Sequence, residues 1–431
     1  MYLCAMDLIY FPVRRNWRAI KRFRKKPILG LLGILYFLLL VPSSWAQNTG
    51  IGDKSITVGS LLPLEGDRKE SGLAIKAGLE AAFASQSIQG RRIELAALND
   101  FYDPAKAVEA AKKLIDHGIF LMVGNHGTPT VKATLPGLAE NKIPLLGPYT
   151  GAALTGPGDV LNFRTSYVKE VQGVLDIALA AGIKPGELCA YVQNDSYGMS
   201  GLQGMRLALA NQPSAAPLVA KLEEIINKPG DNPARNDIGP VGVYQRDTLV
   251  ARNGYQSLKK WEEANKTRCR LVVTVGVFEA VSQFIIYARS KDEPWAFSMV
   301  SFTGTPVRGR FKELGMTGKI IQTQVVPPLD SPLGVVEEAR KALGQNLSYP
   351  ALEGYIVGKL LLAITLAVDG PLSREGFLKA ARRQVYDVGG LKVDFTNGKN
   401  PGSELVFLSY LKDDTAFASA KPGDLEAMLK P

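Results

Sequence analysis

Residues 119–130 read IFLMVGNHGTPT, an apolar run that passes into glycine, asparagine, histidine and hydroxyl-bearing residues. The apolar half predicts a buried strand, and the next stretch, VKATLPGLAE, has the spacing of a helix. Thr128 is well placed to cap that helix, and Pro129 suits its first turn. A helix start carries unpaired N–H groups and partial positive charge, so it can bind an anion. The stretch therefore predicts either an ordinary capped helix or a ligand site where a strand ends.

The same alternation of strand and helix continues on both sides of this stretch. Short apolar runs such as SITVGSLL (55–62) and RIELAALN (92–99) are separated by amphipathic stretches such as PAKAVEAAKKLIDHG (104–118). This order indicates a parallel sheet with right-handed crossovers. A second set of strands, near ELCAYVQ (187–193) and RLVVTVG (270–276), makes the chain too long for one typical domain. We therefore expect two α/β lobes.

The first 46 residues have the pattern of a secretory signal peptide. A basic segment (14–26) precedes the apolar run ILGLLGILYFLLLV (28–41), and Ser44 and Ala46 occupy the small-residue positions of a cleavage site. The alternative is an uncleaved membrane anchor, although the apolar run is short for a span of roughly 20 residues. No cysteine follows the run, so a lipid anchor on an N-terminal cysteine is not expected. The protein is predicted to be periplasmic.

Removing this leader changes the charge balance. The leader holds eight Lys/Arg and one acid, so of the net +10 of the whole chain about +3 remains on residues 47–431. A net charge this small gives no argument for binding nucleic acid.

Cysteine and histidine are too sparse for metal chemistry. Cys189 and Cys269 each begin a strand-like run, and a bridge between neighbouring strands of a parallel sheet strains disulfide geometry. We therefore expect two buried free thiols, with a disulfide as the alternative in an exported protein. The two histidines, His117 and His126, form no cluster with cysteine, so neither a metal site nor a cofactor is expected.

Motifs of common enzyme classes are absent from the sequence. There is no G-x-S-x-G, P-loop, H-E-x-x-H or G-x-G-x-x-G pattern, and no Ser or Cys nucleophile is marked beside His126. No set of nucleophile, base and orienting group can be assembled, so an enzyme is not expected.

Two further segments interrupt the regular pattern. Residues 212–240 carry Pro and Asn at both ends and one short helical piece, KLEEII, which indicates an insertion or a functional lid. Residues 352–368 form a long apolar helix that is interrupted by Lys359, so it is expected to be a core helix rather than a membrane span.

The chain resembles the periplasmic amino-acid-binding proteins of ABC importers, of the leucine/isoleucine/valine-binding type. The order and spacing of several stretches over most of the mature chain carry the resemblance: IKAGLEAAF, NDFYDPAKAVEAAKKLI, VGNHGTPTVKATLP, PLLGPYTGAALT, FRTSYVKE, QNDSYGMSGLQG, SFTG, TQVVP and LEGYIVGKLL. It implies an α/β type I periplasmic-binding fold, with two lobes, each a parallel sheet flanked by helices, and three hinge crossings. Residues 47–165 and 302–402 would form lobe I, and residues 166–301 and 403–431 would form lobe II. The lobes would close around a ligand in the cleft.

The resemblance also implies where a ligand carboxylate would bind. A hydroxyl residue after the third strand matches Thr128, and the loop after the fourth strand matches Tyr149, Thr150 and Gly151. Both segments follow parallel strands, where α/β sheets bind ligands. The plainer readings are a wall aromatic for Tyr149 and a turn for Gly151.

Three more positions follow from the same resemblance. Glu279 matches a family acid that binds the ligand's ammonium, although a first-turn carboxylate is also stabilised by the helix dipole alone. Tyr197 matches an aromatic that lies over the ligand; the alternative is a turn residue packed on its own lobe. Ser71 stands where branched-chain binders can carry an aromatic, so a polar or larger amino acid is as credible a ligand as leucine.

The sequence thus predicts a non-enzymatic, monomeric solute-binding protein. It would capture a small amino-acid-like ligand and deliver it to an inner-membrane ABC permease. The alternative function is a ligand sensor that docks on a membrane receptor, since the same fold serves both roles.

Overall fold

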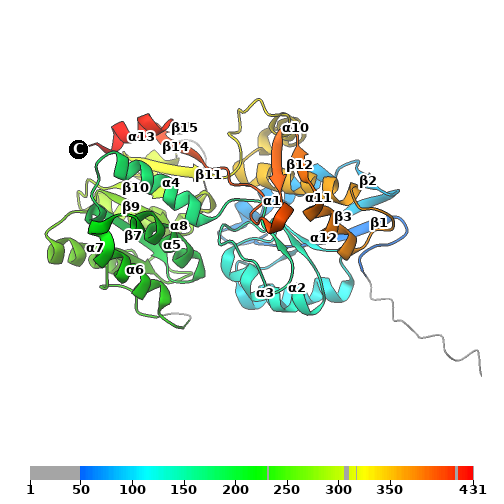
Figure 1. The fold of residues 1–431 in the computed structure, drawn as a ribbon, viewed down its shortest axis with the longest axis horizontal. Helices are drawn as coiled ribbons and strands as arrows, with labels where there is room; N and C mark the ends of the chain where they lie inside the picture. Colours follow the sequence, from blue (N-terminus) through cyan, green and yellow to red (C-terminus); the bar gives the residue numbers. More distant parts are fainter. Residues whose placement is uncertain (1–48, 231–232, 305–309, 317, 413–415, 431) are drawn as a thin grey trace, which may run out of the picture. The chain divides into compact units, whose positions relative to one another are not determined.

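The computed structural model describes residues 49–230, 233–304, 310–316, 318–412 and 416–430. The predicted signal peptide lies outside the described residues. The described chain contains two large sheets, which Figure 1 shows with their helices.

The first sheet has six strands in the order β2-β3-β1-β4-β5-β6. β1 pairs in parallel with β3 and β4, and the parallel pairing continues through β5 to β6, whereas β2 is antiparallel to β3. The strands are β1 (Ser55–Leu62), β2 (Ser87–Ile88), β3 (Arg91–Asn99), β4 (Met122–Val123), β5 (Leu145–Leu146) and β6 (Val160–Leu161). β4 is shorter than the run IFLMV that predicts it, yet all five residues of the run are buried.

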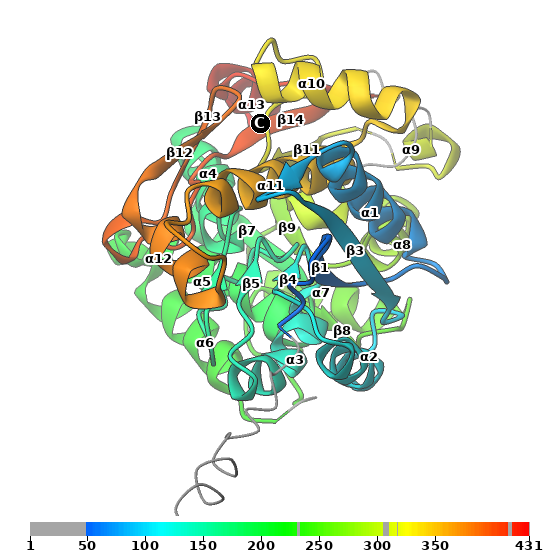
Figure 2. The same cartoon turned by 90° about the vertical axis from the view of Figure 1, so that its right-hand side faces the viewer.

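Helices cover both faces of this sheet. Figure 2 shows α1 and α11 on one face and α2 and α3 on the other. The helices of this half are α1 (Lys69–Phe83), α2 (Pro104–His117), α3 (Thr128–Glu140), α10 (Gly334–Leu343), α11 (Tyr349–Leu366) and α12 (Arg374–Arg383), and a hairpin of β12 (Val385–Val388) and β13 (Leu391–Asp394) follows them. α2 begins where predicted because Asp103 accepts hydrogen bonds from the N–H groups of Ala105 and Lys106.

The long apolar helix is a core helix, as predicted. α11 is long and apolar enough to cross a membrane, but 72% of it is buried inside the structure. It packs against α1, and Gly78 of α1 lies so close that an added Cβ would stand 2.1 Å from the carbonyl oxygen of Ala351.

The second sheet has seven strands in the order β15-β14-β11-β10-β9-β7-β8. The five strands β7, β8, β9, β10 and β11 are parallel, and β14 and β15 are antiparallel additions. The strands are β7 (Leu188–Gln193), β8 (Val241–Tyr244), β9 (Leu271–Val275), β10 (Ala296–Met299), β11 (Ile320–Gln324), β14 (Phe407–Lys412) and β15 (Ala416–Ser419). β7 is buried along its whole length, because a central parallel strand is covered on both faces.

The helices of this half are α4 (Tyr167–Ala180), α5 (Ser196–Ala210), α6 (Ala216–Asn227), α7 (Arg252–Asn265), α8 (Phe278–Arg289), α9 (Arg310–Glu313) and α13 (Pro422–Leu429). α6 contains the KLEEII piece of the predicted insertion. Buried Arg235 anchors the segment after it, since its guanidinium donates to the carbonyl oxygen of Ile225 and to Asn194 Oδ1.

The boundary expected at residue 302 differs from the sheet topology. β11 pairs in parallel with β10, so residues 320–324 belong to the second sheet. The chain then returns to the first half and crosses once more before β14. At this last crossing Gly402 N–H donates to the Asn162 carbonyl (2.8 Å) and Ser403 N–H donates to the Phe163 carbonyl (3.0 Å), so the first and last crossings run as a hydrogen-bonded pair.

The expectation of two free thiols is wrong. Cys189 and Cys269 form a disulfide with a Cα–Cα distance of 5.7 Å. Cys189 lies within β7, but Cys269 lies two residues before β9, whose first residue pairs with Leu188. Because Cys269 is outside the ladder, its backbone is free of the strand geometry on which the expectation of strain depended.

Candidate functional site

Two loops at the carboxyl ends of β4 and β5 run side by side. Tyr149 N–H donates to the Asn125 carbonyl at 2.8 Å, and Gly127 N–H donates to the Tyr149 carbonyl at 3.1 Å. These bonds hold residues 125–128 against residues 149–151. The two segments predicted to bind a carboxylate therefore form one backbone unit at the edge of the first sheet.

Thr128 does not cap its helix. α3 begins at Thr128 after Gly127, and no side chain caps it. Thr130 Oγ1 donates instead to the Gly127 carbonyl, and the Thr128 hydroxyl lies 2.6 Å from Thr150 Oγ1. The prediction that Thr128 is a cap is wrong, because its hydroxyl is directed to the neighbouring loop.

Two glycines allow rings to pack directly on these loops. An added Cβ at Gly127, whose φ is 87°, would lie 2.3 Å from the Tyr102 ring. One at Gly151 would lie 2.7 Å from the Tyr167 ring. Gly151 is therefore more than a turn residue, since only a residue without a side chain lets Tyr167 approach.

Six buried rings gather beside the loops, and we call them the site cluster: Tyr102, His126, Tyr149, Tyr167, Tyr197 and Phe302. The Phe302 ring is central, with centroids 4.9 Å from His126, 5.4 Å from Tyr149 and 5.0 Å from Tyr197. His126 and Tyr149 come from the first sheet, whereas Phe302 follows β10 of the second. The cluster therefore joins the two halves.

Tyr197 has a second attachment within its own half. Its hydroxyl donates to the Gly276 carbonyl at 3.2 Å, and its ring lies 4.9 Å from the Tyr167 ring. Burial raises the pKa of its phenol well above the ordinary value, so the hydroxyl stays neutral. Tyr197 can therefore offer a ring face and a fixed dipole, but no charge.

His126 is the polar member of the cluster. Its Nε2 lies 3.0 Å from Ser71 Oγ. Burial, with the positive charges of Arg68 and Arg164 as lesser causes, lowers its pKa to about 3, so the imidazole is neutral. Its Nδ1 has no hydrogen-bond partner among the described residues. A neutral ring with one free nitrogen can serve a polar group of a ligand.

Glu279 of α8 interacts electrostatically with Arg68, which precedes α1. Glu279 is the second residue of α8, and burial raises the pKa of its carboxyl. Its own N–H and Arg68 act to lower that pKa, and Asp67 and Glu70 act to raise it. Arg68 also lies over the Tyr102 ring at 4.5 Å and pairs with Asp247 at 3.2 Å. Glu279 is thus influenced by one cation, Arg68, and by two carboxylates, Asp67 and Glu70.

A buried charged network lies behind the cluster. Arg164, on the first crossing, places its guanidinium 4.6 Å from the Tyr149 ring and 3.5 Å (Nε to Oε1) from Glu353 of α11. It also donates to Ser301 Oγ, which in turn donates to Glu170 of α4 at 2.9 Å. Burial raises the pKa of Glu353, and the Arg164 charge opposes that rise. Arg164 therefore connects both halves at the crossing.

All seven residues singled out in the sequence lie in this connected region. Thr128, Tyr149, Thr150 and Gly151 meet directly, whereas Ser71 joins through His126 and Glu279 through Arg68. The sequence reasoning missed Arg68, Tyr102, Tyr167 and Phe302 and left His126 without a role. For Tyr102, His126, Tyr167 and Phe302 a signal was present, because each lies within a stretch that carries the resemblance, whereas Arg68 lies outside all of these stretches. Among the described residues, no group of three or more His, Cys, Asp or Glu side chains could hold a metal ion.

Comparison with known proteins bears on the fold of the chain. Residues 55–214 match the family model described as periplasmic binding protein. No protein of curated function matches the sequence.

Solved structures share the fold over most of the chain. A possible leucine/isoleucine/valine-binding protein from Rhodopirellula baltica is 29% identical, with a TM-score of 0.74, covering 86% of this chain and 98% of that one. A branched-chain amino acid ABC transporter protein from Thermus thermophilus with bound valine is 16% identical (TM-score 0.66; 86% and 96% covered). A solute-binding protein from R. palustris in complex with 4-hydroxybenzoate is also 16% identical (TM-score 0.64; 85% and 96% covered).

These findings confirm the predicted fold class. The chain has the two-lobed α/β fold of the type I periplasmic-binding proteins. Its similarity is to solute-binding proteins of the ABC-transporter type, which are not enzymes, in agreement with the sequence.

Proposed function

We propose that this protein captures a small amino-acid-like ligand in the cleft between its lobes and delivers it, in the periplasm, to an ABC importer of the inner membrane. The observation that carries the proposal is the packing of His126 and Tyr149, from the two loops, against Phe302 of the other half, which also packs against Tyr197. A ligand held by the loops would contact both lobes and so stabilise their closure.

The loops suit a carboxylate. The Thr128 and Thr150 hydroxyls lie 2.6 Å apart at the start of α3, where the helix dipole favours negative charge. Each hydroxyl can turn to donate to a carboxylate oxygen, and such charge-assisted hydrogen bonds contribute roughly 1.5–3 kcal/mol.

Glu279 suits an ammonium. It is partly buried and makes no ion pair among the described residues. Asp67 and Glu70 raise the pKa of its carboxyl by repulsion, and the Arg68 charge acts against them. An α-ammonium group placed there would offset the repulsion. With the loops on one lobe and Glu279 on the other, the cleft would recognise the two charges of a zwitterion.

The rings of the site cluster favour a second candidate class of ligand, a carboxylate without an amine. The site cluster offers flat apolar surfaces and neutral dipoles, which would also suit an aromatic acid. The relative that binds 4-hydroxybenzoate shows that this fold accepts such a ligand.

A matched ligand pair separates the two classes. We would measure the affinities of phenylalanine and 3-phenylpropanoate, which differ by the amine, for the mature chain and for Glu279→Gln by calorimetry. The wild type should prefer phenylalanine by about 10- to 100-fold, and Glu279→Gln should lose most of that preference.

The matched control is Glu263→Gln, on an exposed part of α7 in the same lobe. It should leave both affinities unchanged. If the wild type bound 3-phenylpropanoate more tightly than phenylalanine, the ligand class would be carboxylates without an amine rather than amino acids. If no member of a thermal-shift panel of amino acids, aromatic acids and fatty acids stabilised the protein, the proposed function would be refuted.

A further inference from the structure

A cavity of about 700 Å³ lies at the amino ends of the second sheet. Its lining comes from the residues that immediately precede β7, β9, β10 and β11 and from the end of α13. These strands are parallel. The cavity lies before them, whereas Tyr197 and Phe302 of the site cluster follow β7 and β10, so the two sites lie at opposite edges of the second sheet. The cavity is therefore separate from the candidate site.

Positive charge dominates this cavity, which we call the cationic cavity. Six of its lining residues are basic: Lys184, Lys266, Arg268, Arg270, Lys319 and Lys430. Among the described residues that line the cavity, the single carboxylate is that of Glu187, which lies 3.9 Å from Arg270. In the described part of the chain the other five cations make no ion pair. The resulting net charge of +5 exceeds the net charge of about +3 on the whole mature chain.

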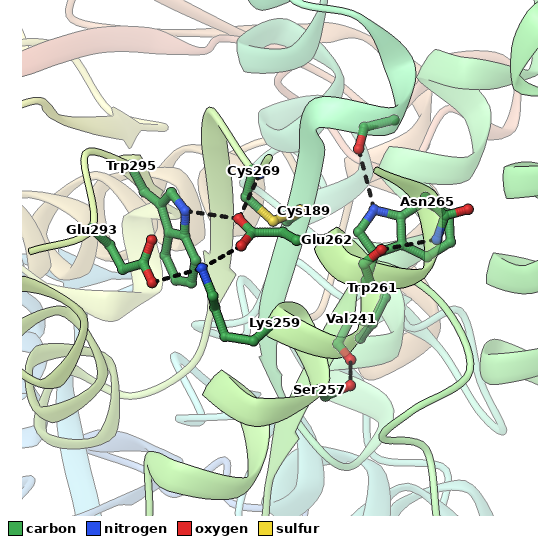
Figure 3. The surroundings of a disulfide bond; sticks show 11 residues. Cys189, Val241, Ser257, Lys259, Trp261, Glu262, Asn265, Cys269, Glu293 and Trp295 are labelled. Atoms are coloured by element: carbon green, nitrogen blue, oxygen red, sulfur yellow. Dashed lines mark hydrogen bonds and ion pairs between the residues drawn. A yellow bond between two sulfur atoms is a disulfide. The ribbon is translucent and has the colours of Figure 1, made fainter. Parts of the chain in front are cut away.

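The disulfide holds three of these cations in place. Lys266, Arg268 and Arg270 belong to the stretch KTRCR (266–270), and Cys269 within it is bonded to Cys189 of β7. Figure 3 shows this bond beside Glu262, whose carboxylate accepts a hydrogen bond from the Cys269 N–H at 2.8 Å. The stretch is therefore held at Cys269 in two ways, through its side chain to Cys189 and through its backbone N–H to Glu262.

Further bonds fix the floor of the cavity. Arg270 N–H donates to the Glu187 carbonyl at 2.8 Å, and the Arg270 guanidinium donates to the Leu429 carbonyl at 2.7 Å. Trp295, just before β10, donates to Glu262 at 3.2 Å (Figure 3). The six cations repel one another, and an anion that neutralises them would relieve that repulsion.

We propose that the cationic cavity binds a multivalent, phosphate-bearing anion. A single carboxylate would neutralise one charge of five, whereas linked phosphates can neutralise several at once. Arginine forks bind phosphate oxygens in pairs, and lysines add point charges. The volume lies within the range of small-molecule sites. The phosphates could belong to a free polyphosphorylated solute or to the headgroups of an anionic membrane.

The test uses the mature chain with its disulfide intact. Calorimetry with inorganic tripolyphosphate compares the wild type with Arg268→Gln/Lys319→Gln, which removes two exposed cavity cations. The matched control is Lys112→Gln/Lys113→Gln, which removes two exposed lysines of α2 in the other half. At physiological ionic strength the cavity variant should lose at least about tenfold in affinity, and the control less than about twofold.

A vesicle arm separates the two sources of phosphate. Co-sedimentation with phosphatidylcholine vesicles that contain phosphatidylglycerol is measured for the same three proteins. Vesicle binding that only the cavity variant loses would assign the site to lipid headgroups, and tripolyphosphate binding without vesicle binding would assign it to a free solute. Absence of both kinds of binding would overturn the proposal, and so would equal losses in the two variants. The affinity for the cleft ligand should not change in any of these proteins, so failure here is distinct from failure of the proposed function.

Discussion

The site cluster takes Tyr197 and Phe302 from the carboxyl edge of the second sheet, whereas the cationic cavity lies at the amino edge of that sheet, and the two differ in almost every physical respect. The cluster is built of rings that are at most 7% exposed, and its histidine and phenols are neutral. The cavity is lined by exposed side chains that carry full positive charge. One sheet therefore presents a buried surface that selects by shape and hydrogen bonds, and an open surface that selects by charge.

The difference has an electrostatic origin. A charge can persist at the open edge because water solvates it, whereas at the closed edge a charge must be paired or neutralised. Arg164 with Glu353 and Glu170 follows the second rule, and Lys319 and Arg268 follow the first. Substitutions of the same kind should consequently have unequal effects at the two edges.

The largest effect is expected at Arg164. Arg164→Met removes the positive partner of two buried carboxylates, so the free energy of unfolding should fall by about 3–5 kcal/mol in urea denaturation. Arg268→Met, the same change in the cationic cavity, should alter stability by about 0.5 kcal/mol or less. Similar losses from the two substitutions would show that burial does not distinguish the edges.

The disulfide should rank second. Its cysteines are separated by 80 residues, so Cys189→Ser/Cys269→Ser should lower the free energy of unfolding by about 2–4 kcal/mol. Because the bond lies at the amino edge, a variant that still folds should retain the affinity for the cleft ligand. A loss of cleft affinity at full folding would mean that the two edges are coupled through the strands.

A pH effect is expected at Asp100, which follows β3. Burial raises the pKa of its carboxyl from 3.8 to about 7, although Tyr102 N–H donates to it at 2.9 Å. The folded protein thus binds this proton more tightly than the unfolded chain, so the stability it contributes is present below about pH 4 and is lost as the pH rises through 7.

Asp100→Asn should remove that dependence. Each unit of the pKa shift corresponds to at most about 1.36 kcal/mol of stability. Because buried charges relax and admit water, we expect a smaller total loss, on the order of 2 kcal/mol, between pH 4 and pH 8. The measurement is the difference between the wild-type and Asp100→Asn stability curves across this range. Parallel curves would mean that the Asp100 carboxylate is charged and well solvated in the folded protein.

The smallest effect is expected for Tyr197→Phe. The change removes the hydrogen bond to the Gly276 carbonyl, but that carbonyl keeps a bond from Thr303 Oγ1 at 2.9 Å. Stability should fall by about 1 kcal/mol or less, because no buried acceptor is left without a partner. A much larger loss in thermal denaturation would show that the phenol has a role beyond this bond.

The sequence predicted the elements better than their partners. Apolar periodicity predicted α2, because that signal is local. The membership of β11 in the second sheet has no local signal, since any buried parallel strand has the same composition. The disulfide was missed for a related reason: whether Cys269 lies inside the ladder or before it depends on a strand boundary, which periodicity defines poorly.

The candidate site shows the same limit. Thr128 was suggested by its place between a strand and a helix, and the 149–151 loop was implied by the family resemblance. Phe302 touches His126 across 176 positions of sequence, and no pattern in either segment announces that contact. The cationic cavity was invisible for the same reason, because its lysines and arginines come from four separate segments of a mature chain whose net charge is only about +3.

The paired crossings have a consequence for how the halves can move. A single strand can swivel about each of its dihedral angles, whereas residues 162–163 and 402–403 are joined by two backbone hydrogen bonds and form a narrow ribbon. A ribbon bends across its flat face and resists rotation about its length. We therefore expect the lobes to open and close mainly by bending of this ribbon, with little twisting of one lobe against the other. The rings on its two sides would then return to the same registration at every closure.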